Sequence, residues 1–449
     1  MPDDTPQYRP ACHFSPQRNW MNDPNGLVFA DGVYHLFYQY HPDGLTWGPM
    51  HWGHATSRDL LHWDEHPIAL YPDDLGMIFS GSIVIDRDNA SGLGRDGKAA
   101  WVAIFTHYDP LKEKVGGNVH QYQSIAYSLD DGFSWAKYAG NPVLPNPGMK
   151  DFRDPKVFWH SDTQRWIMSL AAGDQILFYS SPDLKKWTLE SELGGFDIAH
   201  GNVLECPDLV ALDCDGQHHW VLIVSVFTGA PNGGSGTRYV VGDFDGSRFI
   251  PEHDDIRWLD YGPDNYAGVT FHNTGDQALL IGWMSNWRYA QMVPTAPWRS
   301  AMTLPRVLSL VNVAGRTLLR QNVAMDVGID ALVLDESLDP IGAPVRLKIE
   351  NPGSDDICVI ISNAAGDKLL IGYDTKTREY YIDRRGAGLC DFSPEFSLRA
   401  TAPSQGKGGT VELYLDSSSI ELLAEDGLTL LTSLVFPRSP YTKAVLSRQ

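Results

Sequence analysis

The sequence predicts an all-β protein in which a β-propeller precedes a β-sandwich. Two observations indicate the propeller: short β-rich runs recur between turn residues, and one short motif repeats along the first part of the chain. A third observation marks the second part. After Leu304-Pro305-Arg306 the aromatic residues become fewer and a series of alternating strands follows. Strong helical periodicity is hard to find in the 449 residues.

The β-rich runs of the first part are each short enough to be one strand. We expect strands at Val33–Tyr40, Ser82–Asp86, Trp101–His107, Trp166–Leu170, Ile176–Ser180, Trp220–Phe227 and Leu279–Met284.

The repeated motif ends on a tryptophan each time. Ser57–Trp63 (SRDLLHW) recurs as Ser181–Trp187 (SPDLKKW) and more loosely as Ser128–Trp135 (SLDDGFSW). A degenerate repeat of roughly 50 to 70 residues, each unit holding several short strands, is typical of propeller blades. The alternative is chance reuse of an Asx turn before a strand.

The second part has the alternation of an antiparallel sandwich. Its expected strands are Val345–Glu350, Cys358–Ser362, Lys368–Tyr373, Glu379–Asp383, Thr410–Leu415 and Ser419–Ala424. At roughly 150 residues per domain, a chain with 43% hydrophobic residues can build two or three cores. We expect a propeller at residues 1–315, a linker at 316–335 and a sandwich at 336–449.

The charge balance narrows the class of partner. Lys and Arg number 35 against 56 Asp and Glu, which gives a formal net charge of −21 at pH 7. Such a chain repels phosphate backbones and acidic membrane surfaces, so we expect neither nucleic acid nor membrane as a partner. The aromatic residues suit flat sugar faces and β-sheet cores equally. The sequence makes no prediction of oligomeric state.

Cysteine usage and the N-terminal segment bear on the compartment. Five cysteines, an odd number without a metal-type C-x-x-C pair, do not make a disulfide framework. Residues 1–10 are polar and acidic, without the basic and apolar regions of a signal peptide, and no run of about 18 apolar residues occurs. As printed, the chain is expected in the cytoplasm, and in a secreted or periplasmic location if a signal was removed.

Three acidic residues stand beside prolines in different parts of the first domain. Asp23 lies in WMNDPNG (20–26), Asp154 in FRDP (152–155) and Glu205 in ECP (205–207). Taken singly, each suits an Asx or Pro turn, a solvated loop charge or an ion pair. On three separate blades, however, they would converge at the propeller axis and form one acidic cavity.

Glycoside hydrolysis needs two carboxylates of this kind. One attacks or stabilises the sugar carbon, and the other protonates the leaving oxygen and later deprotonates water, while a third carboxylate can hold sugar hydroxyls. In a retaining enzyme the reacting pair lies about 5 to 5.5 Å apart. Crowding of like charges also raises the pKa of one carboxyl and favours the protonated form that a general acid requires.

Seven ordered motifs are distinctive when taken together: Trp20–Gly26, Tyr34–Tyr40, Trp47–Ala55, Phe79–Ser82, Phe152–Pro155, Glu205–Pro207 and Gly282–Trp287. They resemble glycoside hydrolase family 32, which contains invertases, levanases, exo-inulinases and some fructosyltransferases. Asp416–Glu421 and Val435–Pro437 resemble the family's C-terminal domain, so the resemblance covers nearly the whole chain. It implies a five-bladed β-propeller followed by a C-terminal β-sandwich. It also implies a retaining hydrolase that releases fructose from sucrose or from inulin- or levan-type fructans through a covalent fructosyl-enzyme intermediate.

The resemblance assigns roles to individual residues. It implies that Asp23 is the nucleophile, Glu205 the acid/base, and Asp154 the transition-state stabiliser. The implied substrate-binding residues are Asn22, Gln39, Trp47, Phe79, Ser80, Arg153, Tyr266 and Trp287. Aromatic side chains would wall the sugar ring while Asn, Gln and Ser fix its hydroxyls, and core packing is the alternative for each aromatic. We expect no cofactor and no metal.

One position departs from the family pattern. Many members place a tryptophan directly before the acid/base, whereas this chain has Leu204. We expect the smaller side chain to open space for a different leaving group or acceptor. The runs Trp47–Ala55 and Asp260–Ala267 resemble levanases and exo-inulinases more than plant or yeast invertases.

Alternatives to an exo-acting fructosidase stay open at this point. They are a fructosyltransferase with the same intermediate, a non-catalytic fructan-binding propeller, and an arabinan-type hydrolase of related fold. His51 and His54 could suggest a metal pair, although alternation along strands would disperse such histidines. The glycine-rich run Pro231–Gly236 lacks the lysine and helix of a phosphate loop and is typical of a hairpin or blade loop.

Overall fold

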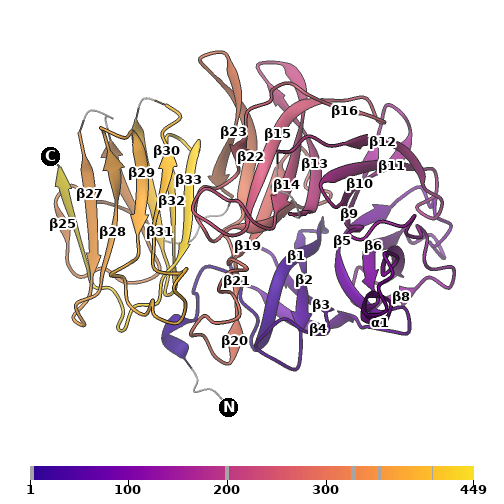
Figure 1. Cartoon of the computed structure of the whole chain (residues 1–449), viewed down its shortest axis with the longest axis horizontal. Helices are drawn as coiled ribbons and strands as arrows, with labels where there is room; N and C mark the ends of the chain where they lie inside the picture. The colour runs from indigo at the N-terminus through magenta and orange to yellow at the C-terminus, as the bar shows by residue number, and fades with distance from the viewer. Residues whose placement is uncertain (1–4, 198–201, 325–329, 352–354, 407, 449) are drawn as a thin grey trace.

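The computed structural model describes residues 5–197, 202–324, 330–351, 355–406 and 408–448. Across these ranges the chain is almost entirely β-structure, and its helices are the 3-10 turn η1 (Pro6–Tyr8) and the short α1 (Pro110–Lys114). Neither of these described helices is long or apolar enough to span a membrane. The predicted fold class, a propeller followed by a sandwich, is confirmed (Figure 1).

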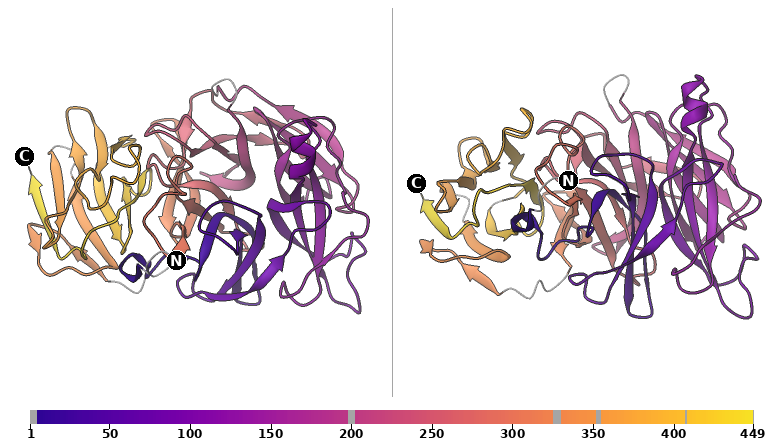
Figure 2. Two further views of the ribbon diagram at one scale, coloured as in Figure 1. Left: turned by 60° about the horizontal axis from the view of Figure 1, so that its bottom comes forward. Right: turned by 90° about the horizontal axis from the view of Figure 1, so that it is seen from below.

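Five mainly antiparallel sheets form the blades of the propeller (Figures 1 and 2). The first holds β1 (Asn19–Ala30), β2 (Val33–His41), β3 (His51–Ser57), β4 (Asp64–Leu70) and β20 (Trp298–Arg299). The second holds β5 (Met77–Asp86), β6 (Ala100–Tyr108), β7 (Gln121–Ser128) and β8 (Ala136–Lys137). The third holds β9 (Arg153–His160), β10 (Arg165–Ala172), β11 (Gln175–Ser181) and β12 (Thr188–Leu193).

The last two blades have the same plan. The fourth holds β13 (Leu204–Cys214), β14 (Gln217–Val226), β15 (Gly236–Phe244), β16 (Phe249–Pro251) and β17 (Arg257–Trp258). The fifth holds β18 (Tyr266–Thr270), β19 (Ala278–Met284), β21 (Ala301–Met302), β22 (Arg306–Val313) and β23 (Arg316–Val323).

The innermost strands close a ring around the axis. β1, β5, β9, β13 and β18 contact one another in this order, and β18 contacts β1 again. The closure is reinforced where β20 pairs in parallel with β1, opposite Asn19 and Trp20. Closing the ring packs the inner edge strand of each blade against its neighbours, so these edges are short and protected.

The repeated sequence motif forms the same turn in the first three blades. Ser57, Ser128 and Ser181 each end the third strand of a blade, and an aspartate two residues later accepts backbone N–H groups from the residues that follow. The closing tryptophans donate their indole N–H to a carbonyl three residues back. The motif is therefore both an Asx turn and the mark of a repeated blade.

The predicted strands coincide with observed ones within a few residues at their ends. Phe227 was predicted as the last residue of a strand, but β14 ends at Val226 and Phe227 lies in the following loop. The glycine-rich run Pro231–Gly236 lies largely in this same loop between β14 and β15, as expected of a hairpin connection. Sheet pairing in the fifth blade continues to Val323, and we therefore propose the domain boundary after that residue.

The second part of the chain folds as two facing, mainly antiparallel sheets. One is ordered β24 (Ala331–Val333), β26 (Val345–Asn351), β31 (Gly409–Leu415), β32 (Ser419–Ala424), β33 (Thr429–Leu434). The other is ordered β25 (Ser337–Leu338), β34 (Lys443–Arg448), β27 (Ile357–Ser362), β28 (Lys368–Asp374), β29 (Glu379–Asp383), β30 (Arg399–Pro403). Alternate residues such as Leu347, Ile349, Val359 and Ile361 face inward and form one buried core.

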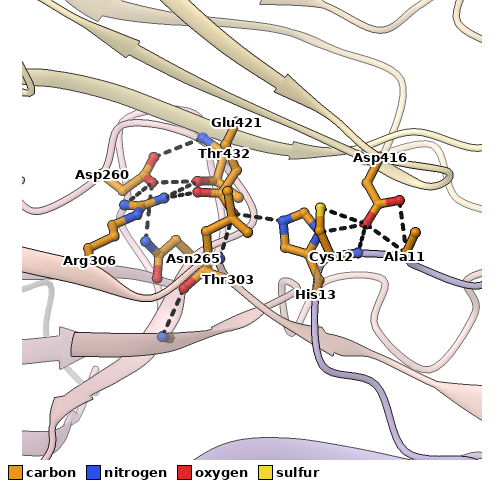
Figure 3. A network of polar contacts seen from close by, with 12 residues as sticks. Ala11, Cys12, His13, Asp260, Asn265, Thr303, Arg306, Asp416, Glu421 and Thr432 are labelled. Carbon is orange, nitrogen blue, oxygen red and sulfur yellow. Dashed lines mark hydrogen bonds and ion pairs between the residues drawn. The ribbon is translucent and has the colours of Figure 1, made fainter. Parts of the chain in front are cut away.

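A buried ionic network joins the sandwich to the propeller (Figure 3). His13 Nδ1 lies 2.8 Å from Asp416 Oδ2, and its Nε2 lies 3.1 Å from Glu421 Oε1. Arg306 continues the network, with Nη2 2.6 Å from Glu421 Oε2 and Nη1 3.0 Å from Asp260 Oδ2. Burial alone would lower the pKa of His13, but its contacts with Cys12 and the two carboxylates raise it well above the ordinary value. His13 is therefore a buried cation held between two acids.

Replacing His13 with alanine is expected to lower the free energy of unfolding by about 3 to 5 kcal/mol, because buried Asp416 and Glu421 lose their shared cation. Urea unfolding at neutral pH measures this difference. The matched control is Lys443→Ala, which breaks an exposed ion pair with Asp339 and should cost about 1 kcal/mol or less. Equal effects of the two substitutions would contradict the importance of the network.

Three histidines of the first blade stack together. His35 Nδ1 lies 3.1 Å from His54 Nε2, and the ring of His54 packs face to face on Phe37 with the centroids 4.2 Å apart. The His66 ring lies 4.8 Å from that of His54. Burial lowers the pKa of His35 to about 4 and that of His54 to about 2, so both are neutral at physiological pH.

A His54→Gln variant is expected to lose less stability than the parent protein on acidification. The unfolded chain protonates His54 near the ordinary pKa of 6.5, whereas the fold holds its pKa at about 2. The contribution of His54 is therefore complete above pH 6.5, and about 2 to 3 kcal/mol of it is lost by about pH 4.5. Urea unfolding across this pH range checks the slope, and parallel slopes in the two proteins would disprove the assignment.

Candidate active site

The three motif acids lie on innermost strands rather than in loops. Asp23 is in β1, Asp154 in β9 and Glu205 in β13, so each belongs to a different blade. The possibility of turn or loop acids, which the sequence left open, is therefore excluded. The adjacent prolines are tolerated because β9 and β13 are edge strands of their sheets, where a missing N–H interrupts no inner ladder.

Bulges turn these side chains toward the axis. Two residues lie opposite one at Phe79-Ser80 in β5, Asp154-Pro155 in β9, Cys206-Pro207 in β13 and Ala267-Gly268 in β18. β1 has two such register shifts, between Met21 and Pro24 and between Asn25 and Val28. A bulge bends its strand and re-aims a side chain, so bulges in all five innermost strands bring side chains from five blades together.

The backbone at three of these bulges is strained. Asp154, Cys206 and Ala267 have φ values of 65°, 47° and 54°, in the left-handed region that non-glycine residues rarely adopt. Such conformations persist where the surrounding structure imposes them, and they gather at functional sites.

A pocket of about 340 Å³ lies where the three acids meet. Besides the three acids, it is lined by seven of the residues that the family resemblance implied: Asn22, Gln39, Trp47, Phe79, Ser80, Arg153 and Trp287. Larger hollows, of about 580 and 630 Å³, lie elsewhere on the molecule and contain none of the three acids. The carboxylates therefore identify the site better than cavity size does.

Asp23 is held by donors on both carboxylate oxygens. Ser80 Oγ donates to Oδ2 at 2.6 Å, and Asn22 Nδ2 donates to Oδ1 at 3.0 Å. Asn22 is fixed in turn by the indole N–H of Trp20, 2.8 Å from its Oδ1. These contacts hold the carboxylate in one orientation within the pocket.

Arg153 lies between the other two acids. Its Nη2 and Nε donate to Glu205 Oε1 at 3.0 and 3.2 Å, and its Nε lies 4.0 Å from Asp154 Oδ2. Asp151 Oδ1 accepts from Nη1 at 2.7 Å and fixes the other side of the guanidinium. Asp154 Oδ2 also accepts the backbone N–H of Cys206 at 3.0 Å.

Tyr266 contacts Glu205 although it is not part of the pocket lining. It is 1% exposed and does not line the cavity, but its hydroxyl donates to Glu205 Oε2. Burial and the neighbouring Glu205 raise the pKa of Tyr266 well above its ordinary value, so the phenol keeps the proton that it donates.

Burial and neighbouring charges alter the ionisation of Asp154 and Asp23. Burial raises the pKa of Asp154 to about 7; the Arg153 charge opposes this rise, and Glu205 and Asp23 add to it. Burial and the charge of Glu205 also raise the pKa of Asp23, against the hydrogen bonds from Ser80 and Asn22. Asp154 is therefore partly protonated near neutral pH.

Aromatic rings form the walls of the pocket. Trp47, 37% exposed, meets Phe79 edge to face with the centroids 6.2 Å apart, and Phe79 stacks on Tyr108 at 4.5 Å. On the other side Trp287 stacks on Trp20 at 6.0 Å. The arrangement gives a sugar ring apolar surfaces above polar groups that can bind its hydroxyls.

Sequence reasoning missed six residues of the lining. They are Tyr108, Glu113, Gln121, Asp151, Phe227 and Gln291. Asp151 could have been predicted from its spacing to the candidate Arg153, because residues two apart in an extended chain share a face. The others come from strand ends, α1 and loops that only the tertiary fold places beside the acids.

The expectation for Leu204 is wrong. Its side chain is fully buried in the core between the third and fourth blades, and it does not line the pocket. It pairs across the sheet with Val226, and the next residue, Phe227, reaches the pocket instead. The size of the side chain at position 204 therefore does not determine the space in the pocket beside Glu205.

One cluster of possible metal ligands occurs among the described residues, at the domain interface. Ligand atoms of Cys12, His13 and Asp416 lie within 4.8 Å of one another, but they are engaged in the buried ionic network. His51 and His54 do not form the pair that their spacing suggested, since His51 contacts the Pro49 carbonyl and His54 contacts His35.

Comparison with known proteins identifies the chain. The family model described as Glycosyl hydrolases family 32 N-terminal domain matches residues 13–322, and the C-terminal model of that family matches residues 323–449. The chain belongs to glycoside hydrolase family 32. The predicted enzyme class, a glycoside hydrolase, is therefore confirmed.

Relatives of this family 32 chain agree in sequence and structure. A levanase of Bacillus subtilis is 44% identical over 96% of the chain, which matches 66% of that protein, and an extracellular exo-inulinase of Aspergillus awamori is 38% identical over 98% of the chain and 91% of its own length. The A. awamori exo-inulinase crystal structure superposes with a TM-score of 0.90 at 36% identity, covering 98% of this chain and 95% of that one. A fructofuranosidase of Schwanniomyces occidentalis complexed with fructose gives 0.87 at 33% identity, covering 100% and 96%.

Proposed function

We propose that this family 32 enzyme releases fructose from the ends of β-fructosides with retention of configuration. The observation that carries the proposal is the convergence of Asp23, Asp154 and Glu205 around Arg153 in one pocket. The related levanase, exo-inulinase and fructofuranosidase support the substrate class.

Asp23 is the nucleophile and Glu205 the acid/base. A carboxylate oxygen of Asp23 forms a bond to the anomeric carbon C2 of fructose while the bond from C2 to the leaving oxygen breaks, and Glu205 gives its proton to that oxygen. Water then attacks C2, its proton passes to Glu205, and the bond between C2 and Asp23 breaks to release fructose. The donors from Ser80 and Asn22 keep the Asp23 carboxylate aimed at C2.

Asp154 stabilises the positive charge that develops on the sugar, and Arg153 positions Asp154 and Glu205. The Nε atom of Arg153 lies near both acids, and the Asp154 carboxylate can accept hydrogen bonds from fructose hydroxyls. Trp47 and Phe79 cover an apolar face of the ring, and Gln39 contributes a polar side chain to the same wall.

The closed floor of the pocket favours attack on a terminal unit. Beneath the acids lies a cavity of about 10 Å³, lined in part by Pro24, Pro155 and Pro207, which holds at most one water. A sugar chain has no path onward along the axis. A single fructosyl unit therefore fills the blind end while the rest of the substrate points outward.

A substrate panel tests the proposal. Purified protein is incubated with sucrose, 1-kestose, inulin and levan, and the products are resolved by chromatography over time. Free fructose as the first product from each cleaved polymer is expected, whereas larger oligosaccharides as first products would contradict terminal attack. No fructose from any of the four would overturn the function. Longer fructans at high sucrose would reveal transfer in place of hydrolysis.

We also propose that the enzyme meets its substrate outside the cytoplasm. Inulin and levan are too large to cross a membrane unaided, and the A. awamori relative is named an extracellular enzyme. Activity confined to the cytoplasmic fraction of the native cells would contradict this location.

A further inference from the structure

Phe227 is an aromatic side chain exposed at the mouth of the pocket. It lines the cavity together with Glu205 and is 40% exposed, although large hydrophobic side chains usually find cover. Its ring packs against Trp287 with the centroids 6.2 Å apart, and Trp287 is backed by Trp20. One face of a supported aromatic surface is thus left open beside Glu205.

The fold places the Phe227 ring on the same side of the pocket as Glu205. Glu205 pairs across the sheet with Ser225, and Phe227 follows two residues later, in the loop directly after β14. The fructose walls Trp47 and Phe79 come instead from the first two blades. Because the acid/base must face the leaving oxygen, the side of the pocket that holds Glu205 and Phe227 is the leaving-group side.

The loop that carries Phe227 is fixed rather than free. The backbone N–H of Phe227 donates to the Val203 carbonyl at 3.2 Å. Asn202 clamps the next residue, because its Nδ2 donates to the Thr228 carbonyl at 2.6 Å and its Oδ1 accepts the Thr228 N–H at 3.0 Å. A ring held in place in this way binds a partner at little cost in conformational entropy.

We propose that Phe227 is the platform on which the leaving sugar stacks, and that it determines specificity for the leaving group. This inference rests on the proposed function. The sugar next to the cleaved bond presents an apolar face to the ring, while Glu113, Gln291 and Asp151 contribute polar groups to the lining of the same pocket. The incoming acceptor in transfer occupies the same place as the leaving sugar, so the platform also favours transfer at high sugar concentration.

The test compares substrates that reach the platform with one that does not. Phe227→Ala should lower kcat/KM for sucrose and 1-kestose about 10-fold, and Phe227→Trp should restore most of it. The same Ala variant should leave kcat/KM for methyl β-fructofuranoside and the inhibition constant of fructose within about twofold, because neither ligand extends past the fructose walls. The fraction of transfer products at high sucrose should fall in parallel.

The control is Phe133→Ala, which removes a 55% exposed phenylalanine outside the pocket and should change none of these ratios. Equal losses on methyl fructoside and 1-kestose in Phe227→Ala would show a general disturbance of the site and overturn the proposal, as would no loss on either. If the parent protein cleaved none of these fructosides, the proposed function itself would fail.

Discussion

Replacing Asp23 with asparagine is expected to lower kcat on sucrose or 1-kestose by roughly 10⁴-fold or more, since the amide has no charge with which to form the bond to C2. The substitution keeps the size of the side chain, and Ser80 and Asn22 remain in place around it. Initial rates of fructose release measure the loss, and fructose binding measured by calorimetry should persist.

The matched control for this change is Asp88→Asn, which neutralises an exposed carboxylate outside the pocket and should leave kcat unchanged. A folded Asp23→Asn protein with the parental rate would remove Asp23 from the mechanism. Loss of activity accompanied by a lowered unfolding temperature would instead point to a structural role, and thermal unfolding of both variants distinguishes the two results.

Replacing Glu205 with glutamine is expected to lower kcat on sugar substrates by roughly 10² to 10⁴-fold, because no group then protonates the leaving oxygen or activates water. An aryl fructoside has a leaving group that departs without a proton, so its first step should be much less affected. A burst of aryl alcohol followed by slow turnover is the expected trace. Added azide should speed the second step, because the anion attacks C2 without needing a base.

Arg153 and Tyr266 make this test specific. Arg153 donates to Oε1 of Glu205 and Tyr266 donates to Oε2, so a glutamine with one amide oxygen keeps one of these two hydrogen bonds. The equal size of the two side chains and the remaining contact should keep the shape of the pocket in the variant. Equal losses on sugar and aryl substrates, without rescue by azide, would contradict the acid/base role.

Local sequence patterns predicted much of the fold. The β-rich runs correspond to strands because alternation and β-branched or aromatic residues report the local backbone. The turn motif ending at Trp63, Trp135 and Trp187 was visible because an Asx turn and its indole contact span only a few residues. By contrast, β1 was obscured by Asn22-Asp23-Pro24, which has the composition of a turn and lies in a bulged strand.

Local motifs also predicted part of the candidate site. The motif residues cluster around the three acids in one pocket, but the inference from Leu204 failed. Adjacency to Glu205 in sequence suggested adjacency in the pocket, whereas consecutive strand residues point to opposite faces. Phe227, 22 positions further along, takes the place beside Glu205 because a hairpin returns the chain to it.

The sequence by itself determined the family, the fold class and the acids that the chemistry needs, because residue type and short-range periodicity are local properties of the chain. The tertiary structure alone decided how these residues meet. Arg153 reaches Glu205 across 52 positions, and Cys206 lies 3.6 Å from an oxygen of Asp23 across 183. Such contacts depend on bulges, on strand register and on the closure of five blades, and one shifted register would turn each of these side chains to the opposite face.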